Sequence, residues 1–462
     1  MVFPMSGRTA EATSRVGGAA DLIRKDLAEL MRLAWPVVFA RLGIMTMGLT
    51  DALVVGQFSA VQLGYHALGW APTAVVLTVG LGLLSGVQVM ASRAIGEGRL
   101  HEAGHVLRRG LSYALWIGLA STAILITGGP LFLRHSGVST DLAEGASRAL
   151  VVFSLSLPAT ALSVAGSSWL EGLGRPKPAM VMMWIANVVN LVVDLLLVPG
   201  TFGLPAMGAV GGAWATTASR TALAVVTLIY IARMRDARDL GVFDRPRRDR
   251  MREIIQRRIG YGAGASNFFE VAAFASMNIV AGWLGAVAVA AYAAVINVAS
   301  LVFMVPLGLA TATAVLVGRA YGARDRAAVT RAALIGFALA AAFGLIVSLI
   351  VWPGAPLIAR AFTSEPAALT LAASALVLSA LFLAPDAVQV VVAQALRTRG
   401  DVLAPTLTHM VSYALVMIPL AAYLAVPGKM GIAGIMWAII WATFVSAALL
   451  LTRFWMLSRR PL

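Results

Sequence analysis

The chain has 462 residues, of which 60% are hydrophobic and only 12% charged, and its mean hydropathy is +0.85. This composition lies far outside the range of soluble domains and indicates a protein that lies largely within a membrane. The absence of cysteine excludes disulfides, thiolate catalysis and cysteine-bound zinc. A net charge of +15 could suggest nucleic-acid binding, but the distribution of the basic residues favours solvated loops beside anionic lipid instead.

Apolar segments long enough to cross a bilayer recur along the chain. A membrane-spanning helix needs about 20 mostly apolar residues. Twelve segments meet this requirement, so we predict an all-α integral membrane protein. The predicted spans are 31–57, 66–92, 109–131, 147–170, 178–199, 207–232, 257–283, 290–317, 329–352, 367–395, 403–425 and 431–457.

The 36 lysines and arginines are distributed unequally between the two sides of the predicted membrane. Most lie in the N-terminal tail, in the loops after even-numbered spans and in the C-terminal tail. The loops after odd-numbered spans hold Arg134, Arg148, Arg360 and Lys429. Because Lys and Arg are enriched in cytoplasmic loops, we predict that both termini are cytoplasmic. We expect a multi-pass monomer in a bacterial plasma (inner) membrane, in contact with lipid and not with nucleic acid.

The two halves of the chain resemble each other. The segments Ser92–Gly96 and Gly318–Gly322 share the pattern Arg-Ala-x-Gly and lie 226 residues apart, as do Gly174 and Gly400. Each half has an even number of spans and enters the membrane in the same orientation, which predicts two six-helix lobes about a pseudo-two-fold axis along the membrane normal. The predicted division is a cytoplasmic tail 1–30, an N-lobe 31–232 (spans 1–6), a basic cytoplasmic linker 233–256, and a C-lobe 257–462 (spans 7–12) that ends in a short tail.

Four acidic residues, Asp51, Asp194, Glu270 and Asp386, fall inside predicted spans. A carboxylate at the bilayer centre costs about 2.5–3.5 kcal/mol on insertion scales, so such residues usually face an interior or a water-filled cavity and serve function. A two-lobed membrane protein with acids near its midplane is most simply a carrier that opens alternately to either side.

Amide side chains accompany these acids. Asn187, Asn190 and Asp194 are spaced i, i+3 and i+7 and share a helix face, which suits a monovalent cation or a hydrogen-bonded proton. In the second half, Asn267 precedes Glu270 by one turn and Gln389 follows Asp386 by one turn. We expect no basic side chain in the interiors of spans 7–12, so these acids should bind a cation or share a proton.

At these motifs the chain resembles the multidrug and toxic compound extrusion (MATE) transporters, in particular their NorM-like branch, over about residues 30–457. The similar segments are Leu33–Pro36 with Met47–Asp51, the loop Leu170–Arg175, Asn190 with Asp194, the helix start Gly211–Thr216, Phe268–Val271 and Pro385–Val390. One departure is Phe382, which lacks a hydroxyl where some NorM-like members carry tyrosine one turn before the acid.

The resemblance implies roles for particular residues. It places Asp51, Asn190, Asp194 and Thr216 in an N-lobe cation or proton site, with Asn187 on the same helix face. It makes Glu270 and Asp386 a C-lobe coupling pair. A monovalent cation could bind at Asp51, Asn190, Asp194, Glu270 and Asp386, and no cofactor or other metal is expected.

Two basic residues and one motif stand apart from this assignment. Arg41 and Arg220 lie within spans; Arg41 is interpreted either as a counter-charge for Asp51 or as an interfacial arginine. His101-Glu102-Ala103-Gly104-His105 matches H-E-x-x-H, the zinc pair and base of many metalloproteases. It lies in a basic loop without an evident third ligand, which favours a charged loop.

We therefore predict a secondary active transporter, not an enzyme, that exports amphipathic and in the main cationic organic compounds in exchange for Na⁺ or H⁺. One alternative is a lipid-linked oligosaccharide flippase of the same superfamily, whose phosphate-bearing substrate would call for arginines in the cleft. An alternative from another class is an intramembrane zinc protease, which depends only on the H-E-x-x-H motif.

Overall fold

The computed structural model describes residues 7–244, 249–363 and 365–460, and all regular structure in these segments is helical. Residues 1–6 of the predicted tail, 245–248 of the predicted linker and the last two residues lie outside the described segments. The elements are α1 Gly7–Phe58, α2 Ala60–Gly96, α3 Leu100–His135, α4 Thr140–Leu155, α5 Leu157–Gly172, α6 Pro176–Leu197, the 3₁₀ turn η1 Thr201–Gly203, α7 Gly208–Ala232, α8 Arg250–Leu284, α9 Ala286–Gly322, α10 Arg326–Arg360, α11 Pro366–Thr398, α12 Leu403–His409, the π-helix η2 Met410–Met417, α13 Ile418–Ala425 and α14 Ile432–Ser458.

The predicted membrane class is confirmed. Eleven helical stretches in the described residues are long and apolar enough to span a membrane, and α4 with α5 forms a twelfth if the pair is counted as one span. That pair bends by 41° where α4 ends and α5 begins. Pro158 stands at the start of α5, where its missing N–H costs no hydrogen bond of the new helix and its ring disfavours an unbroken continuation of α4.

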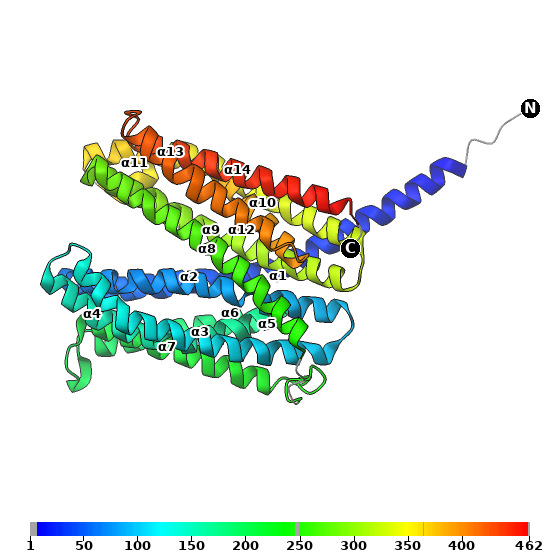
Figure 1. The fold of residues 1–462 in the computed structure, drawn as a ribbon, viewed down its shortest axis with the longest axis horizontal. Coiled ribbons are helices and arrows are strands. Elements are labelled where there is room, and N and C mark those ends of the chain that lie inside the picture. Colours follow the sequence, from blue (N-terminus) through cyan, green and yellow to red (C-terminus); the bar gives the residue numbers. More distant parts are fainter. Residues whose placement is uncertain (1–6, 245–248, 364, 461–462) are drawn as a thin grey trace, which may run out of the picture.

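The N-terminal tail is not separate from the first span. The structure continues α1 from Gly7 to Phe58, and its first turns project beyond the bundle (Figure 1). The described part of the linker is also ordered against the N-lobe, because the Gly104 N–H donates to the Leu240 carbonyl at 2.8 Å. Arg175 binds both carboxyl oxygens of Asp236 at 3.0 and 2.6 Å, and this hydrogen bonding holds the pKa of Asp236 below its ordinary value.

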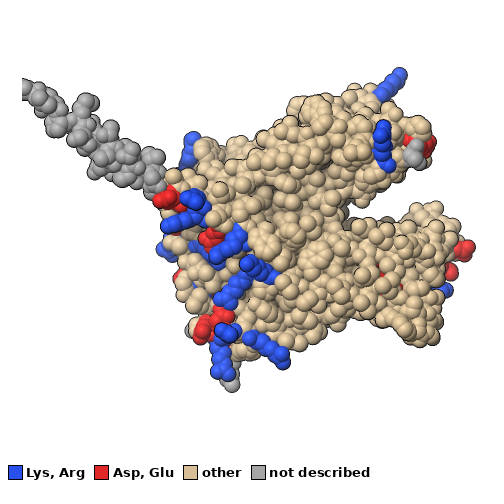
Figure 2. Space-filling model, turned by 180° about the vertical axis from the view of Figure 1, so that it is seen from behind, with Lys and Arg blue, Asp and Glu red and all other residues tan. Residues whose placement is uncertain are grey.

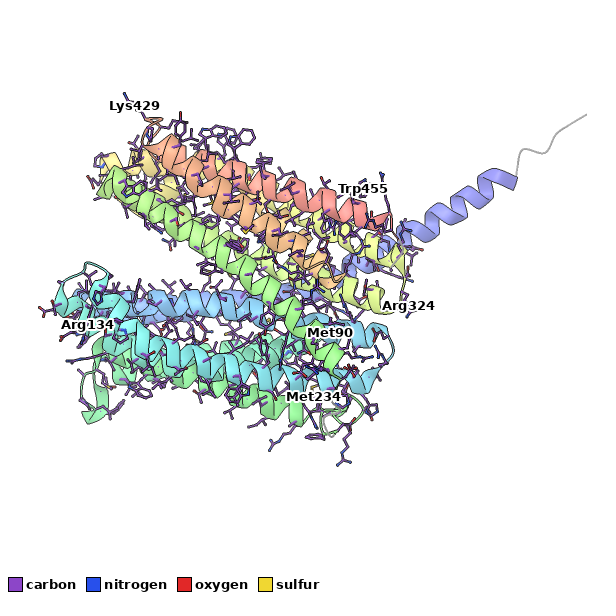
Figure 3. The ribbon with its side chains drawn as sticks, viewed as in Figure 1. Met90, Arg134, Met234, Arg324, Lys429 and Trp455 are labelled. Carbon is purple, nitrogen blue, oxygen red and sulfur yellow. The ribbon has the colours of Figure 1, made fainter. Side chains whose placement is uncertain are left out.

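The helices form two groups that diverge from one end of the molecule (Figure 1). One group contains α1–α7 and the other α8–α14, and α2 packs along α8 and α9 where the groups meet. Arg134 and Lys429 lie at the far tips of the two groups, whereas Met234, Arg324 and Trp455 lie at the opposite end (Figure 3). We call these the open end and the basic end.

The surface supports this division into ends. Figure 2 shows a hollow between the two groups at the open end, with few charged side chains around it. Lysines and arginines gather at the other end, close to where α1 leaves the bundle (Figure 2). The charge asymmetry predicted along the sequence therefore corresponds to two physically different ends of the molecule.

The repeated segments meet each other at the basic end. A β-carbon added at Gly96 would collide with the carbonyl oxygen of Arg319, and one added at Gly322 would collide with the carbonyl oxygen of Arg93. Glycine is therefore required at both positions, because the end of α2 and the end of α9 touch backbone to backbone.

Two arginines in these segments cross between the lobes in opposite directions. Arg93 of α2 donates from Nε and Nη2 to the Thr398 carbonyl at the end of α11, at 3.0 and 2.5 Å. Arg319 of α9 donates from Nη2 to the Leu173 carbonyl at the end of α5, at 2.8 Å. The last carbonyls of a helix have no partner within it and carry its partial negative charge, so a guanidinium there is favourable. We call these two contacts the arginine clasp.

Each arginine of the clasp has a further contact on the opposite lobe. Arg93 lies over the ring of Tyr321, 4.6 Å from its centroid, and Arg319 forms a 2.9 Å ion pair with Glu29 of α1. Gln88 of α2 adds a 3.0 Å hydrogen bond to the Thr311 carbonyl in α9. Polar contacts thus close the basic end, while the lobes separate at the other.

Replacing either clasp arginine should loosen the basic end. Because a hydrogen bond to a charged group contributes about 1.5–3 kcal/mol, Arg93→Gln or Arg319→Gln should increase the exposure of a buried interface position by about tenfold. The chain has no cysteine, so Ser92→Cys, which is buried in the interface, provides a single reporter for maleimide labelling. Arg324→Gln at the same end is the matched control. Equal labelling rates in all variants would show that apolar packing alone closes this end.

Candidate functional site

Asp51 is the centre of a polar cluster inside the N-lobe. Its side chain is buried, and both carboxyl oxygens accept hydrogen bonds from other helices. Asn190 of α6 donates from Nδ2 to Oδ1 at 2.8 Å, and Thr216 of α7 donates from Oγ1 to Oδ2 at 2.5 Å. Three helices therefore bring to one point residues that lie 139 and 165 positions apart from Asp51 in the sequence.

Asp194 lies one turn beyond Asn190 and faces Asp51. It is fully buried, and within the described residues neither of its carboxyl oxygens accepts a hydrogen bond. Its carboxyl group is close enough to that of Asp51 for the two to interact. A hydrogen bond between the two carboxyl groups would require a proton on one of them. Two adjacent carboxylates repel when both are charged, so the pair is suited to hold one proton or a small cation.

Asn187, which was expected on the same face, has different contacts. Its Nδ2 donates to the Met183 carbonyl in its own helix at 2.9 Å, and its buried Oδ1 has no partner in the described residues. The structure thus brings Asp51, Asn190, Asp194 and Thr216 together but does not hydrogen-bond Asn187 to them.

Two residues of the N-lobe cluster were not predicted. The buried ring of His66 in α2 has its Nε2 3.9 Å from Asp51 Oδ2 and packs edge-on against Phe153. Arg220 of α7 is also buried, and its guanidinium lies over Trp70 at 4.9 Å. Arg220 was noticeable in the sequence as a charge within a span, whereas no pattern distinguished His66.

Two cavities adjoin this cluster. One, the acidic cavity, is lined by Asp51, His66 and Thr216, and the other, the apolar cavity, is lined mostly by apolar side chains. Ile44, Met47 and Arg220 line both, so the cavities are neighbours. The cluster is therefore accessible to a bound molecule from an apolar compartment of the same lobe.

The C-lobe holds a second acidic cluster. Asp386 in α11 is buried, and Gln389 donates to its Oδ1 at 3.4 Å. Glu270 of α8 is partly buried and lies close enough to Asp386 for their charges to interact. Tyr413, on the π-helix η2, is fully buried near both acids, and its hydroxyl has no partner in the described residues. Tyr413 thus brings a hydroxyl group close to these acids, whereas the side chain of Phe382 has none.

The predicted interiors of spans 7–12 hold no basic side chain, but a buried arginine lies just past the predicted end of span 10. Arg397, which the sequence placed in a loop, ends α11 with only 5% of its surface exposed, and its charge acts on Glu270. Its Nε and Nη2 are enclosed without a partner in the described residues. α11 continues past the predicted end of span 10 at residue 395, which carries Arg397 into the protein.

Two further residues, Asn267 and Arg41, contact partners that the sequence did not indicate. Asn267 does not accompany Glu270, because its Nδ2 donates to the Thr78 carbonyl of the other lobe at 2.9 Å. Arg41 is not a counter-charge for Asp51, because its Nη2 lies 3.9 Å from Oε1 of the buried Glu171.

The H-E-x-x-H motif is part of an ion-pair network. Glu102 binds Arg109 at 2.6 Å and Arg252 at 3.0 Å, and His101 Nδ1 lies 2.8 Å from Asp244 Oδ2. A carboxylate that two guanidinium groups neutralise is a poor general base. Within the described residues no three His, Cys, Asp or Glu side chains are grouped as metal ligands.

Two groups of membrane-spanning helices that separate at one end, each with buried acids in its interior, define the class of membrane transporters. The model of the MatE family matches the chain twice, over residues 36–196 and 263–423, which is one match for each half. The chain therefore belongs to the MATE family and, by the relatives below, to its NorM branch, and it is a transporter of the multidrug resistance class rather than an enzyme.

The similarity to individual relatives covers nearly the whole chain. It is 61% identical to the probable multidrug resistance protein NorM of Caulobacter vibrioides, over 95% of this chain and 93% of that protein. It is 28% identical to multidrug resistance protein NorM of Vibrio cholerae, over 86% and 87%. The fold matches a MATE crystal structure in the bent conformation (TM-score 0.86, 22% identity, 95% and 97% covered) and the eukaryotic MATE transporter AtDTX14 (TM-score 0.85, 18% identity, 94% and 96% covered).

Glu102→Gln should affect stability and not chemistry. Loss of the carboxylate leaves Arg109 and Arg252 without their partner, so we expect the melting temperature of the purified protein to fall by several degrees, which corresponds to about 1–2 kcal/mol. The His101→Ala change, at a more exposed pair, should have a smaller effect. Elemental analysis should find no stoichiometric zinc in any of the three proteins. Zinc at one per chain in the wild type, lost in Glu102→Gln, would contradict this.

Proposed function

We propose that the protein exports amphipathic organic compounds, in the main cations, in exchange for inward movement of Na⁺ or H⁺ by alternating access. The observation that carries the proposal is the buried pair Asp51 and Asp194 beside the N-lobe cavities. A buried pair of acids that shares one charge site can bind either the coupling ion or a cationic substrate. Competition between the two for that charge couples their movements.

The hydrogen bonds to Asp51 support this assignment. Asn190 and Thr216 each donate one hydrogen bond to a different carboxyl oxygen of Asp51. These neutral donors orient the carboxyl group without neutralising its charge. Within the described residues Asp194 has no such donors, and its enclosed, unpartnered oxygens suit a bound proton or a desolvated cation. Binding of an ion would thus change contacts of α1, α6 and α7, the three helices that meet there.

The acids Glu270 and Asp386 form the proposed second coupling site. Gln389 and Tyr413 surround them with polar atoms from α11 and η2. A helix that widens into π geometry often marks a functional position, because the altered register turns side chains toward the interior. Arg397 on the basic side limits how much positive charge this site can hold.

The orientation follows from the charge asymmetry. We propose that the basic end faces the cytoplasm of a bacterial cell and the open end faces outward, with both termini inside. The structure then corresponds to the outward-facing state, in which substrate leaves and the ion enters. The chain is proposed to act as a monomer, with the N-lobe over 31–232 and the C-lobe over 257–462.

The ion can be identified in proteoliposomes. Efflux of a cationic dye from vesicles containing the purified protein should be driven by an imposed Na⁺ gradient or by an imposed pH gradient, each applied while the other is absent. If neither the Na⁺ gradient nor the pH gradient drives efflux of the dye, the proposed antiport is contradicted.

Asp51→Asn and Asp194→Asn should each reduce coupled efflux to background. Neutral amides keep the shape of the side chain but bind neither a proton at neutral pH nor the charge of a cation, and removing a buried acid should not harm folding. Asn187→Ala, whose amide bonds only within its own helix, is the matched control and should retain most activity. Efflux near the wild-type rate in both aspartate variants would remove the N-lobe from the mechanism.

Glu270→Gln and Asp386→Asn should change the ion dependence of efflux. We expect the Na⁺ concentration or proton concentration for half-maximal efflux to shift by about tenfold, since each change removes about 1.4 kcal/mol or more of charge interaction. The measurement is efflux rate against ion concentration. An unchanged midpoint with only a lower maximal rate would assign these acids a structural role.

A further inference from the structure

Arg220 is the most unusual charged residue of the N-lobe interior. It lies one helical turn after Thr216 on α7 and therefore on the same face as the donor to Asp51. It is 8% exposed and lines both cavities. In the apolar cavity it is the only charged residue among those that the structure describes, and the rest of the wall is mostly apolar.

The guanidinium group of Arg220 is incompletely satisfied by the protein. Its one hydrogen bond in the described residues runs from Nη1 to the Ser156 hydroxyl at 3.4 Å, and it lies over the face of Trp70. No carboxylate of the described residues lies within 4.0 Å of it, although Asp51 is near enough to act on its charge. An arginine has five N–H donors, so most of them lack a protein partner.

The free donors face the cavities. None of the Arg220 nitrogens is both enclosed and unpartnered in the described residues, in contrast to Nε and Nη2 of Arg397. The nitrogens without a hydrogen bond are therefore reachable from the cavity space. A buried guanidinium with open donors is costly unless an anionic group binds it, and its planar fork matches a carboxylate.

We propose that Arg220 is the anion-recognising residue of the N-lobe cavity and binds the carboxylate of a zwitterionic substrate whose cationic group faces Asp51. The apolar body of such a molecule would occupy the apolar cavity, with Arg220 at its boundary and Asp51 in the wall of the adjoining one. This inference rests on the proposed export of amphipathic compounds and extends it to a second charge of the substrate. It makes the cavity selective for the presence of an acid group, not only for a positive charge.

The test compares two forms of one dye. A xanthene dye with a free carboxyl group is a zwitterion, and its ethyl ester is a cation of nearly the same shape. Binding of each to the purified protein is measured by fluorescence anisotropy in detergent. The wild type should bind the acid about tenfold more tightly than the ester, which is the order of effect expected for one charge-assisted hydrogen-bonded pair.

Variants then locate the effect. Arg220→Gln should weaken binding of the acid by about tenfold and change binding of the ester by less than about twofold. Arg220→Lys keeps the charge but loses the fork, so it should retain part of the preference for the acid. Ser156→Ala removes a hydrogen-bond partner of Arg220 without removing its charge and should leave the preference in place.

The outcomes separate this inference from the proposed function. If Arg220→Gln weakens both dyes equally, or neither, Arg220 is structural and the assignment is overturned. If Arg220→Gln does not fold, the assignment is decided by the acid preference of the wild type and of Arg220→Lys. Equal binding of the acid and the ester by the wild type overturns the assignment. If the wild type neither binds nor exports either dye, the proposed function itself fails. Export of the ester with no acid preference would refute only the role of Arg220.

Discussion

A charge that leaves water inside a membrane must be met by a proton, an ion or a set of donors, and this requirement shapes both lobes. In the N-lobe, α6 and α7 supply Asn190 and Thr216 to Asp51, while Asp194 has no donor among the residues that the structure describes. In the C-lobe, α11 supplies Gln389 to Asp386 and, at its end, the guanidinium of Arg397. The two acidic clusters are therefore not equivalent. In the N-lobe the donors and the charge of Arg220 act on Asp51, whereas in the C-lobe Gln389 binds Asp386 and the charge of Arg397 acts on Glu270.

The same requirement explains why the two ends of the molecule differ. At the basic end, arginines satisfy helix-end carbonyls and ion-pair partners across the lobes, and these contacts need no ligand. At the open end the lobes separate and present few charged side chains to the space between them (Figure 2). Opening the basic end must break several charge-assisted contacts together. Such a change needs a driving force, and under the proposed mechanism the binding of an ion or substrate to the buried acids supplies it.

Much of the fold followed from the sequence because membrane spans are set by length and polarity alone. The bend between α4 and α5 lies inside one predicted span, since hydropathy does not register a helix break.

Asn190, Asp194 and Asp51 were grouped correctly because acids inside spans are rare and because the family motifs connect them. Arg397 was misplaced for a related reason, because a charged residue at the end of an apolar run was assigned to the loop, although α11 continues through it. Asn187 and Asn267 show the limit of helical periodicity, which gives the face of a side chain but not its partner. His66 and Tyr413 come from helices with no acidic residue near them in sequence, so only the packing of α2 and η2 against the clusters places them there.

The arginine clasp has the form of an isologous interface, in which a residue of one unit contacts a site on the second unit and the reverse contact is also made. Arg93 reaches the end of α11 and Arg319 reaches the end of α5, while Gly96 and Gly322 lie against each other's segments. A six-helix protein half this size could make the same contacts as a parallel homodimer. Joining two such halves in one chain keeps the symmetric contacts and frees other matched positions to diverge. Glu171 and Arg397 occupy corresponding places 226 residues apart, and both are buried at the end of the helix that accepts the clasp. One half carries an acidic residue there and the other a basic residue, a difference that identical subunits could not have.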